Sequence, residues 1–349
     1  MARDAEVIVV GAGVMGLATA RALGREGRAV LLLEQFELNH DRGSSHGTSR
    51  IFRFSYPEEP WVRLAQEALP LWRELEAEAG HPLLEHTGSL DFGDWEPNRR
   101  ALEAAGAELE VLDAAEIEAR FPSVAAGGET ALFQPDGGFV HAAQAQSALA
   151  AAGAVAGVRL LEGTRAERLC ASAGDGVRVE TADGTFGADA VVVTAGAWAA
   201  SLLAPLGLEL PVVTTRETVT YYTLEHDGAI PSVINLAGGH HARYALTAPG
   251  VGLKAGLHMT GPPTDPDEPS VPDDELAAET AAWVTRQFRG TTPLGRAETC
   301  LYTTTDDERF LLERHGRVVV GSACSGHAFK FAPAVGRRLA TLAADALAA

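Results

Sequence analysis

The chain of 349 residues carries 47 Asp and Glu against 28 Lys and Arg, a formal net charge of −19, with 46% hydrophobic and 21% charged residues. This length predicts two domains or one elaborated domain, the composition excludes a disordered chain, and the acidic balance argues against nucleic-acid binding. Three cysteines make neither a disulfide framework nor a paired zinc motif, so we expect a reducing cytoplasmic environment and no metal site.

The chain begins with a pattern of strand, helix and strand. Residues 7–10 form a β-branched run, 17–26 an Ala- and Leu-rich helical stretch, and 29–33 a second apolar run that ends at Glu34. Residues 1–6 contain two acids and one base, and glycines interrupt the apolar stretch 6–20, which argues against a signal peptide. The sequence has no run of about 18 uncharged apolar residues, so we expect no membrane-spanning helix.

The segment from residue 59 to 152 is richer in helical patterns. We predict a helix at 59–80 with a break or kink at Pro70, a strand at 88–92, helical structure at 97–120 and a helix at 142–152. Asp113 resembles the cap of a helix start within the third of these segments.

Strand patterns then dominate. From 157 to 195 we predict several strands with a hairpin turn at 181–184, and 191–193 are apolar on consecutive positions, as in a strand that joins the parallel sheet begun at residue 7. Residues 211–260 read as further strands, 261–273 as an exposed loop, 274–288 as a helix and 318–323 as a strand before a final helix.

A glycine motif follows the first strand. Gly11, Gly13 and Gly16 form G-x-G-x-x-G at the opening of a helix, and Glu34 ends the next strand. The first two glycines allow a tight turn and close approach to a pyrophosphate at the helix N-terminus, and the third allows close packing of helix and sheet. Glu34 would accept hydrogen bonds from a ribose. These residues predict a dinucleotide site but leave NAD and FAD both open.

Four further segments resemble one known family. They are GSSHGTSRIFRFSY at 43–56, GLKAGLH at 252–258, TCLYTTTDDERFLL at 299–312 and SGHAFKFAPAVG at 325–336. In this order they are similar to the monomeric sarcosine oxidase and N-methyl amino acid oxidase branch of the D-amino-acid oxidase-like FAD-dependent oxidoreductases. With the glycine motif they span almost the whole chain.

The resemblance implies an α/β fold with an α+β second domain. A Rossmann-like FAD-binding domain would be assembled from residues 1–80, 141–210 and 291–349. Residues 81–140 and 211–290 would form a substrate domain with a mixed, largely antiparallel sheet over the flavin.

The resemblance also implies the cofactor contacts. Cys300 stands where the family cysteine bonds through sulfur to the flavin 8α-methyl group, and the alternative is a buried structural thiol. Ser45 and Thr48 are expected to contact the FAD. Cys170 and Cys324 lie in predicted strands and are interpreted as structural.

Cationic residues would act on the substrate and on oxygen. The resemblance makes Arg53 and Lys330 ligands of a substrate carboxylate, which a guanidinium binds well, and Arg50 a neighbour of the flavin ring. It makes Lys254 the cation that stabilises superoxide. The alternative for Arg53 and Lys330 is a solvated surface charge, and Lys254 could point to water from its strand.

The remaining candidates are His258 and His327, which would position substrate and tune the flavin environment or serve as structural groups, and Tyr244, a candidate for the substrate pocket. The chain departs from the family pattern where Ala328 replaces a glycine and Cys324 an aromatic residue.

The resulting hypothesis is an FAD-dependent amine oxidase that acts on CH–NH bonds, as a monomer. It would oxidise a secondary amino acid, N-methyl or cyclic, to the imine, and O2 would reoxidise the flavin to give H2O2. The first alternative is a biosynthetic oxidase or dehydrogenase of a pipecolate-like, piperideine-carboxylate-type or otherwise tailored amino acid. The others are a flavin-binding protein without turnover and an NAD-dependent dehydrogenase.

Overall fold

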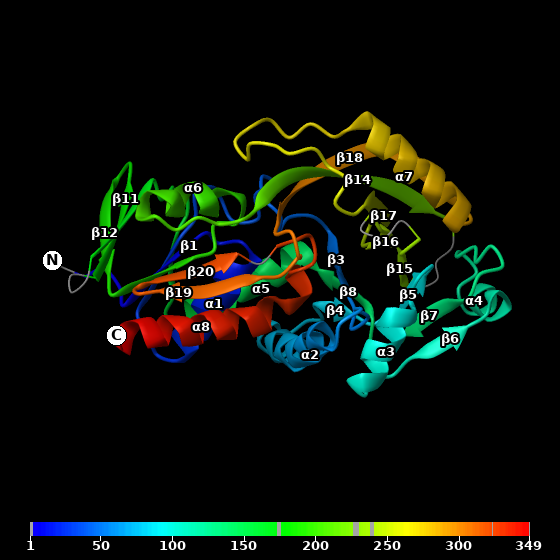
Figure 1. Cartoon of the computed structure of the whole chain (residues 1–349), viewed down its shortest axis with the longest axis horizontal. Coiled ribbons are helices and arrows are strands. Elements are labelled where there is room, and N and C mark those ends of the chain that lie inside the picture. Colours follow the sequence, from blue (N-terminus) through cyan, green and yellow to red (C-terminus); the bar gives the residue numbers. More distant parts are fainter. Residues whose placement is uncertain (1–2, 173–175, 226–229, 238–240, 323, 349) are drawn as a thin grey trace.

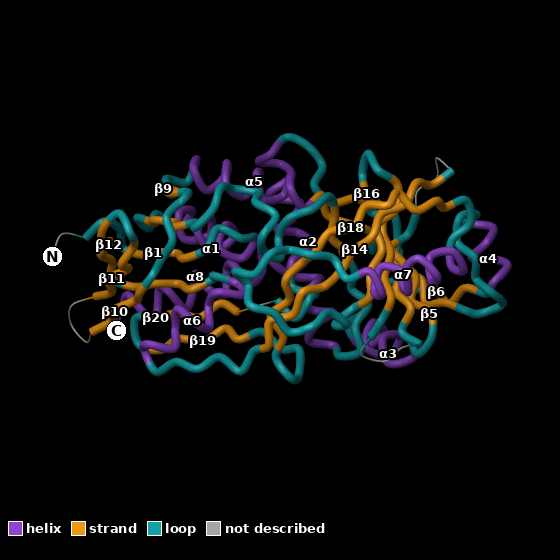
Figure 2. Tube along the Cα trace, turned by 90° about the horizontal axis from the view of Figure 1, so that it is seen from above, coloured by secondary structure: helices purple, strands orange, loops and turns teal. Residues whose placement is uncertain are grey.

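The computed structural model describes residues 3–172, 176–225, 230–237, 241–322 and 324–348. The molecule is elongated, and the first and last described residues lie at the same end of it (Figure 1). One half is built on a parallel sheet and the other on a large, largely antiparallel sheet, so the strands of the second sheet gather at the far end (Figure 2). This arrangement confirms the predicted α/β fold class with an α+β second part.

The parallel sheet contains the glycine motif. Its strands, in spatial order, are β19 (Leu311–His315), β20 (Val318–Ser322), β13 (Ala190–Val193), β1 (Val7–Val10), β2 (Val30–Leu33) and β9 (Arg159–Leu161). All pairs are parallel except β19 with β20. The central strands are fully buried because layers cover both faces, which explains their uninterrupted apolar runs.

Helices cover one face of this sheet and a small sheet covers the other. The helices are α1 (Val14–Arg25), α5 (Ala142–Val155) and α8 (Ala332–Ala348), with α2 (Glu59–Ala79) packed against α5 and α8. The small sheet, β10 (Arg168–Ser172), β11 (Gly176–Thr181) and β12 (Gly184–Ala188), packs its apolar residues against Ile8 and Val10, together with the short helix α6 (Ala199–Leu203).

The second half is an eight-stranded sheet. Its order is β18 (Thr291–Thr304), β14 (Val213–Leu224), β17 (Gly252–Leu257), β16 (Arg243–Ala248), β15 (Ser232–Asn235), β5 (Ser89–Phe92), β7 (Ala131–Gln134) and β6 (Glu110–Leu112). Among the described strands of this sheet, only β15 and β5 pair in parallel, so the sheet is mixed and largely antiparallel. Helix α7 (Asp274–Gln287) packs on β14, β17 and β18 (Figure 1).

A third small sheet lies between the two halves. It is made of β3 (Ser49–Phe52), β8 (Gly138–His141) and β4 (Leu84–Glu85), and β3 also contacts β16 and the 3-10 turn η3 (Phe329–Phe331). The segment 43–56 is thereby placed where both halves meet. Two other 3-10 turns are η1 (Gly196–Trp198) and η2 (Ala204–Leu206). The division into two domains with the stated boundaries stays a prediction.

Three local features differ from what the sequence indicated. The span 97–120 is not one helical segment: α3 (Glu96–Ala104) and α4 (Ala114–Arg120) flank strand β6, which pairs with β7. Of the break or kink expected at Pro70, the break does not occur, because helix α2 continues through this residue. Strand β15 was not predicted as a separate strand within the span 211–260, because its four residues carry little pattern of their own.

The predicted loop at 261–273 contains no helix or strand. The predicted strand at 318–323 ends at Ser322, and residue 323 lies outside the described residues. Within the described part of the chain, no helix is long and apolar enough to span a bilayer.

Candidate active site

One large cavity, of about 1110 Å³, runs from the glycine motif to the face of the eight-stranded sheet. A site of this size can hold a dinucleotide and a small substrate together. Twelve of the fourteen predicted site residues line it: Gly11, Gly13, Glu34, Ser45, Arg50, Arg53, Tyr244, Lys254, His258, Cys300, His327 and Lys330. Gly16 and Thr48 are not among the lining residues.

The glycine motif forms the end of the cavity beside the parallel sheet. Gly11 has φ +95°, which a side chain would disfavour, and a Cβ there would lie 2.7 Å from the carbonyl oxygen of Thr194. Gly16 lies on α1, where a Cβ would overlap the carbonyl oxygen of Gly11. Gly13 and Ser45 approach each other, and the backbone N–H of Val14 donates to Ser45 Oγ at 3.1 Å. The motif therefore folds as predicted, with Gly16 in a packing position.

Glu34 is 4% exposed, yet it lines the cavity. Its Oε2 accepts a hydrogen bond from the N–H of Ala12 at 2.7 Å, and its Oε1 accepts one from the N–H of Phe36 at 3.0 Å. These bonds tie the carboxylate to the glycine turn. Because each carboxylate oxygen can accept two hydrogen bonds, both retain capacity for ribose hydroxyls.

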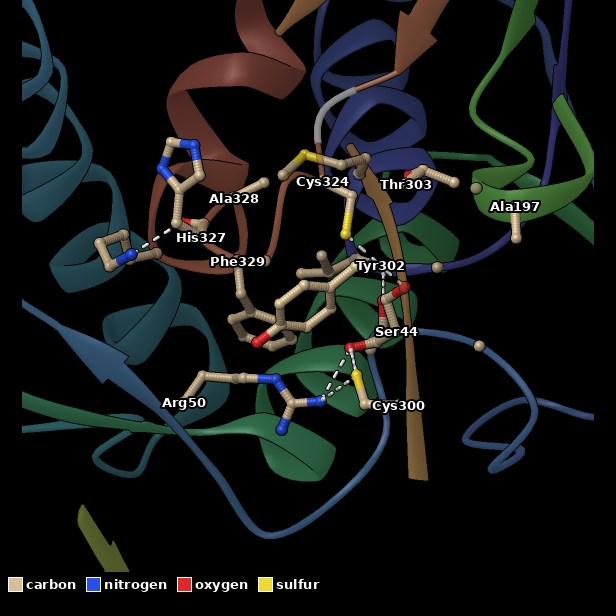
Figure 3. Close-up of a pocket in the computed structure, with 18 of the residues that line it drawn as sticks. Ser44, Arg50, Ala197, Cys300, Tyr302, Thr303, Cys324, His327, Ala328 and Phe329 are labelled. Atoms are coloured by element: carbon tan, nitrogen blue, oxygen red, sulfur yellow. Dashed lines mark hydrogen bonds between the residues drawn. The ribbon is translucent and has the colours of Figure 1, made fainter. Parts of the chain in front are cut away.

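Arg50 lies at the base of the cavity beside Cys300 (Figure 3). Its NH2 donates to the carbonyl oxygens of Ser44 at 2.8 Å and of His46 at 2.5 Å, and lies 3.9 Å from Cys300 Sγ. Cys300 comes from β18, is 9% exposed and lies 3.7 Å from the Ser44 carbonyl oxygen. Burial raises the pKa of Cys300, whereas the Arg50 charge acts to lower it.

Lys254 points into the cavity and away from solvent. It is 6% exposed on β17, and its Nζ donates to the carbonyl oxygen of Ser49 at 3.3 Å. Burial lowers its pKa to about 7, and the Arg50 charge contributes to this shift. A lysine with this pKa can lose or gain its proton near neutral pH.

Two polar atoms beside these cations lack partners. Within the described residues, neither His46 Nε2 nor Thr48 Oγ1 has a hydrogen-bond partner, although both are buried. Burial lowers the pKa of His46 to about 4, with further contributions from Arg50 and Lys254. Buried polar atoms are normally paired, so His46, which lines the cavity, is suited to contact a bound group.

A second cationic group lies farther along the cavity, around Tyr56. The guanidinium carbon of Arg53, from the segment after β3, lies 5.0 Å from the centre of the Tyr56 ring. Lys330 Nζ, from η3, donates to the Tyr56 hydroxyl at 2.8 Å and to the His327 carbonyl oxygen at 2.7 Å. Burial lowers the pKa of Lys330 well below its ordinary value, and the Arg53 charge lowers it further.

His327 is hydrogen-bonded on both ring nitrogens. Its Nε2 lies 3.1 Å from the carbonyl oxygen of Glu308 and its Nδ1 lies 3.2 Å from the Tyr56 hydroxyl. A carbonyl only accepts, so Nε2 carries the proton and Nδ1 accepts from Tyr56. Burial and the Lys330 charge lower the pKa of His327 to about 3, which keeps the imidazole neutral.

His258 and Tyr244 complete the wall from the eight-stranded sheet. The His258 ring centre lies 5.6 Å from that of Tyr302, and its Nε2 lies 3.9 Å from a carboxylate oxygen of Glu308. Tyr244 lies on β16 against Gly256, where a Cβ would come within 2.7 Å of its hydroxyl. Burial raises the pKa of both tyrosines, so they stay protonated.

The other two cysteines differ in their surroundings. Cys170 lies on β10 and is not among the lining residues of the cavity, and its Sγ lies 3.6 Å from Glu180 Oε1. Cys324 was expected to lie in a strand. It lies instead in the loop after β20, because β20 ends at Ser322. It lines the cavity, and its Sγ lies 3.8 Å from Ser44 Oγ (Figure 3).

Several residues of the site were not singled out in the sequence. His46, Tyr56 and Tyr302 lie inside the segments that carry the family resemblance, so their neighbours could have indicated them. Thr194, whose Oγ1 donates to the carbonyl oxygens of Val10 and Gly11, follows a predicted strand. Asp91 carried no signal, since it lies in an apolar strand.

The residues present fit FAD. The glycine turn is free of side chains where a pyrophosphate would approach the N-terminus of α1. The unpartnered nitrogen of His46 and the Cys300 thiol line the same cavity as the glycine turn, and both could contact the ring system of a bound FAD. The described residues contain no group of three or more His, Cys, Asp or Glu side chains arranged to hold a metal ion.

Comparisons with known proteins agree with this geometry. The family profile for FAD dependent oxidoreductases matches residues 6–342. The chain is 36% identical to peroxisomal sarcosine oxidase of Mus musculus, covering 96% of this chain and 90% of the relative. It is 33% identical to monomeric sarcosine oxidase of Bacillus sp. (strain B-0618), covering 98% and 93%.

Among solved structures, NikD, an unusual amino acid oxidase essential for nikkomycin biosynthesis, superposes with a TM-score of 0.88 at 30% identity. The match covers 98% of this chain and 94% of NikD. FAD is therefore the cofactor, and the NAD-dependent alternative is wrong. The chain belongs to the FAD-dependent oxidoreductase family, in the branch of that family that contains the sarcosine oxidases.

Proposed function

We propose that the protein oxidises a secondary amino acid, N-methyl or cyclic, to its imine by hydride transfer to FAD, and that O2 reoxidises the flavin and forms H2O2. One observation carries this proposal: Arg53 and Lys330, from distant segments, meet around Tyr56 in the same cavity as the glycine motif and Cys300. Similar proteins named sarcosine oxidases support the substrate class.

The two cations suit a substrate carboxylate. A guanidinium and an ammonium in a cavity can each donate charge-assisted hydrogen bonds to it. A carboxylate bound there would restore a favourable environment for the Lys330 proton, whose loss is otherwise promoted by burial and by Arg53. Arg53 and Lys330 would thereby fix the carboxylate end of the substrate in the cavity that Lys254 and Arg50 also line.

No residue in the cavity needs to act as a strong base. FAD, when bound, supplies the acceptor for the hydride equivalent. His327 stays neutral and holds the Tyr56 hydroxyl, which in turn accepts from Lys330. His258, Tyr244 and Tyr302 form the wall that positions the substrate and excludes water. Lys254, a buried cation below pH 7, would stabilise the negative charge formed on oxygen.

We infer further that FAD is attached covalently through Cys300 Sγ, in a reaction that would replace one C–H bond of the flavin 8α-methyl group by an S–C bond and pass the two electrons through the flavin to O2. The thiol is buried, lines the cavity and lies against Arg50, whose charge can stabilise the thiolate needed for attachment. Ser44 and Arg50 hold the segment around it, since Arg50 NH2 bonds the Ser44 carbonyl oxygen. Cys324 is the other thiol in the cavity. Its Sγ lies 3.8 Å from Ser44 Oγ, and we interpret it as structural.

The second candidate is a biosynthetic oxidase or dehydrogenase of a pipecolate-like or otherwise tailored amino acid. The likeness to NikD, named an amino acid oxidase, favours it as the alternative. It would use the same carboxylate ligands with a different pocket wall. A flavin-binding protein without turnover is less consistent with the site, because flavin binding alone does not require Arg53, Lys330 and Lys254.

Anaerobic bleaching of the flavin tests the proposal. A panel of N-methyl and cyclic amino acids is mixed with the protein without oxygen, and the absorbance of oxidised flavin is followed. At least one N-methyl or cyclic amino acid should bleach it, whereas its methyl ester should not. Peroxide release on admission of air separates an oxidase from a dehydrogenase. A yellow protein that no member of the panel bleaches would contradict the proposal.

We also propose that the protein works as a monomer in the cytoplasm. The Bacillus relative is named monomeric, and the chain has three cysteines and no disulfide framework. Size-exclusion chromatography with light scattering would contradict this proposal if it gave twice the chain mass of 36.6 kDa.

A further inference from the structure

A buried carboxylate lies directly behind Arg53. Asp91, on β5, has no exposed surface and accepts hydrogen bonds from three side chains. Arg53 NH1 lies 3.2 Å from its Oδ1 and 3.4 Å from its Oδ2, and Asn98 Nδ2 donates to Oδ2 at 2.8 Å. The Ser55 hydroxyl also donates to Oδ2. Asp91 is thus held by one full charge and two neutral donors.

Burying the Asp91 carboxylate costs free energy, and the fold alone does not require a charged residue at this position. β5 is an interior strand that pairs with β7 and β15, and its neighbours Leu90 and Phe92 are buried apolar residues. An apolar residue at position 91 would satisfy the strand without removing a charge from water. A buried charge is retained only with compensating partners. The charged partner of Asp91 is Arg53, so we infer that Asp91 acts on Arg53.

Arg53 is held from two sides and open on a third. Asp91 accepts a hydrogen bond from Arg53 NH1, and the Arg53 guanidinium lies over the Tyr56 ring. Nε and NH2 of Arg53 have no hydrogen-bond partner within the described residues, and the side chain, 16% exposed, lines the cavity. NH1 is therefore fixed by the protein, while Nε and NH2 keep donors that can bind a carboxylate in the cavity that Arg53 lines.

We propose that Asp91 is a positioning residue, which fixes the NH1 edge of Arg53 so that the opposite edge is presented to the substrate carboxylate. The proposal rests on the proposed function of Arg53 as a carboxylate ligand. A long side chain that is already ordered loses less conformational entropy on binding. The Asp91 charge also offsets the charge of Arg53 when no substrate is present.

The test compares wild-type holoenzyme with Asp91→Asn. The dissociation constant of cyclopentanecarboxylate is measured from the flavin difference spectrum, with cyclopentanecarboxamide as the uncharged probe. We expect Asp91→Asn to weaken carboxylate binding about tenfold, on the order expected when one long side chain must be ordered on binding. The dissociation constant of cyclopentanecarboxamide should be the same for both proteins. For the amino-acid substrate, KM should rise by a similar factor while kcat stays within about twofold.

Two further variants separate positioning from a merely structural role. In an Arg53→Gln background, Asp91→Asn should cause no further loss of carboxylate affinity, because Asp91 acts through Arg53. Glu110→Gln is the matched control. Glu110 lies on β6 of the same sheet and forms a surface ion pair with Arg120, so removing its charge should leave the affinity for the carboxylate unchanged. If Asp91→Asn does not fold, Ser55→Ala removes one donor to Asp91 and should weaken carboxylate binding by a smaller factor.

Defined results would overturn the inference. Equal or tighter carboxylate binding by Asp91→Asn would mean that Asp91 does not position Arg53, or only competes with the substrate for it. Further loss of affinity in the Arg53→Gln background would mean that Asp91 acts by another route. Either result, with wild-type protein that the amino-acid panel still bleaches, leaves the proposed function standing. A wild type that neither binds the carboxylate nor is bleached overturns both.

Discussion

Replacing Gly16 by Ala tests whether the third motif glycine has a packing role distinct from nucleotide binding. A Cβ at Gly16 would overlap the Gly11 carbonyl oxygen and lie 2.7 Å from Thr194 Oγ1. In a helix, Gly to Ala normally stabilises by about 1 kcal/mol. Overpacking against backbone costs up to about 3 kcal/mol, so we expect a net loss of about 2 kcal/mol.

The assay is thermal unfolding of flavin-free protein, prepared in a Cys300→Ser background. A net loss of that size lowers Tm by roughly 4–8 °C in a protein domain of 150–250 residues. Gly153→Ala, on α5, is the matched control: a Cβ there meets nothing closer than 3.7 Å, so its Tm should rise. Gly13→Ala should keep the parent Tm and bind FAD more weakly, since its Cβ would lie 3.2 Å from Ser45 Oγ on the cavity side. A Gly16→Ala protein that melts at or above the parent Tm would refute the reasoning.

Three other predictions follow from the charges in the cavity. Arg53→Gln should raise KM for the amino acid by about 10- to 100-fold, the value of lost charge-assisted hydrogen bonds, and steady-state kinetics that leave KM unchanged would contradict the role of Arg53. Reoxidation of reduced flavin by O2 should slow as pH rises through about 7, where Lys254 loses its proton. Lys254→Met should be slow at every pH in stopped flow, and equal slowing of reduction by substrate would contradict the oxygen role. His46 and His327 have pKa values of about 4 and about 3 in the folded protein, below the ordinary 6.5, so the unfolded chain binds more protons in between. The free energy of unfolding should therefore fall as pH drops below 6.5, by about 1.4 kcal/mol per pH unit for each proton. In thermal melts at a series of pH values, the stability of His327→Gln should depend less steeply on pH than that of wild type. An unchanged dependence would contradict the low pKa of His327.

The first strand, the glycine turn and the helix after it were predicted well because their signals are local. Residues 7–10 form a buried strand and Gly11 adopts positive φ, as the motif requires. The segment 97–120 was mispredicted for the opposite reason. Its Ala- and Glu-rich composition favours helix throughout, but Glu110–Leu112 extends to pair with β7, a contact that composition does not record.

The site could be predicted where motifs carry it and not where tertiary packing makes it. Arg53 and Lys330 were expected to act together, and the structure brings them to Tyr56, which links them. Thr48 was expected at the cofactor but does not line the cavity. Asp91 could not be predicted, because its meaning depends on Arg53, Ser55 and Asn98 arriving from other elements.

The most direct test of the account is whether flavin stays with the chain after denaturation. Protein made with ample riboflavin is precipitated with acid, resolved on a denaturing gel and viewed for flavin fluorescence. We expect a fluorescent band at the chain mass in wild type and in Cys170→Ser, and none in Cys300→Ser, whose flavin is released into the supernatant. A colourless native protein, or a band that persists in Cys300→Ser, would contradict a flavin bound through Cys300 beside the cations of this cavity.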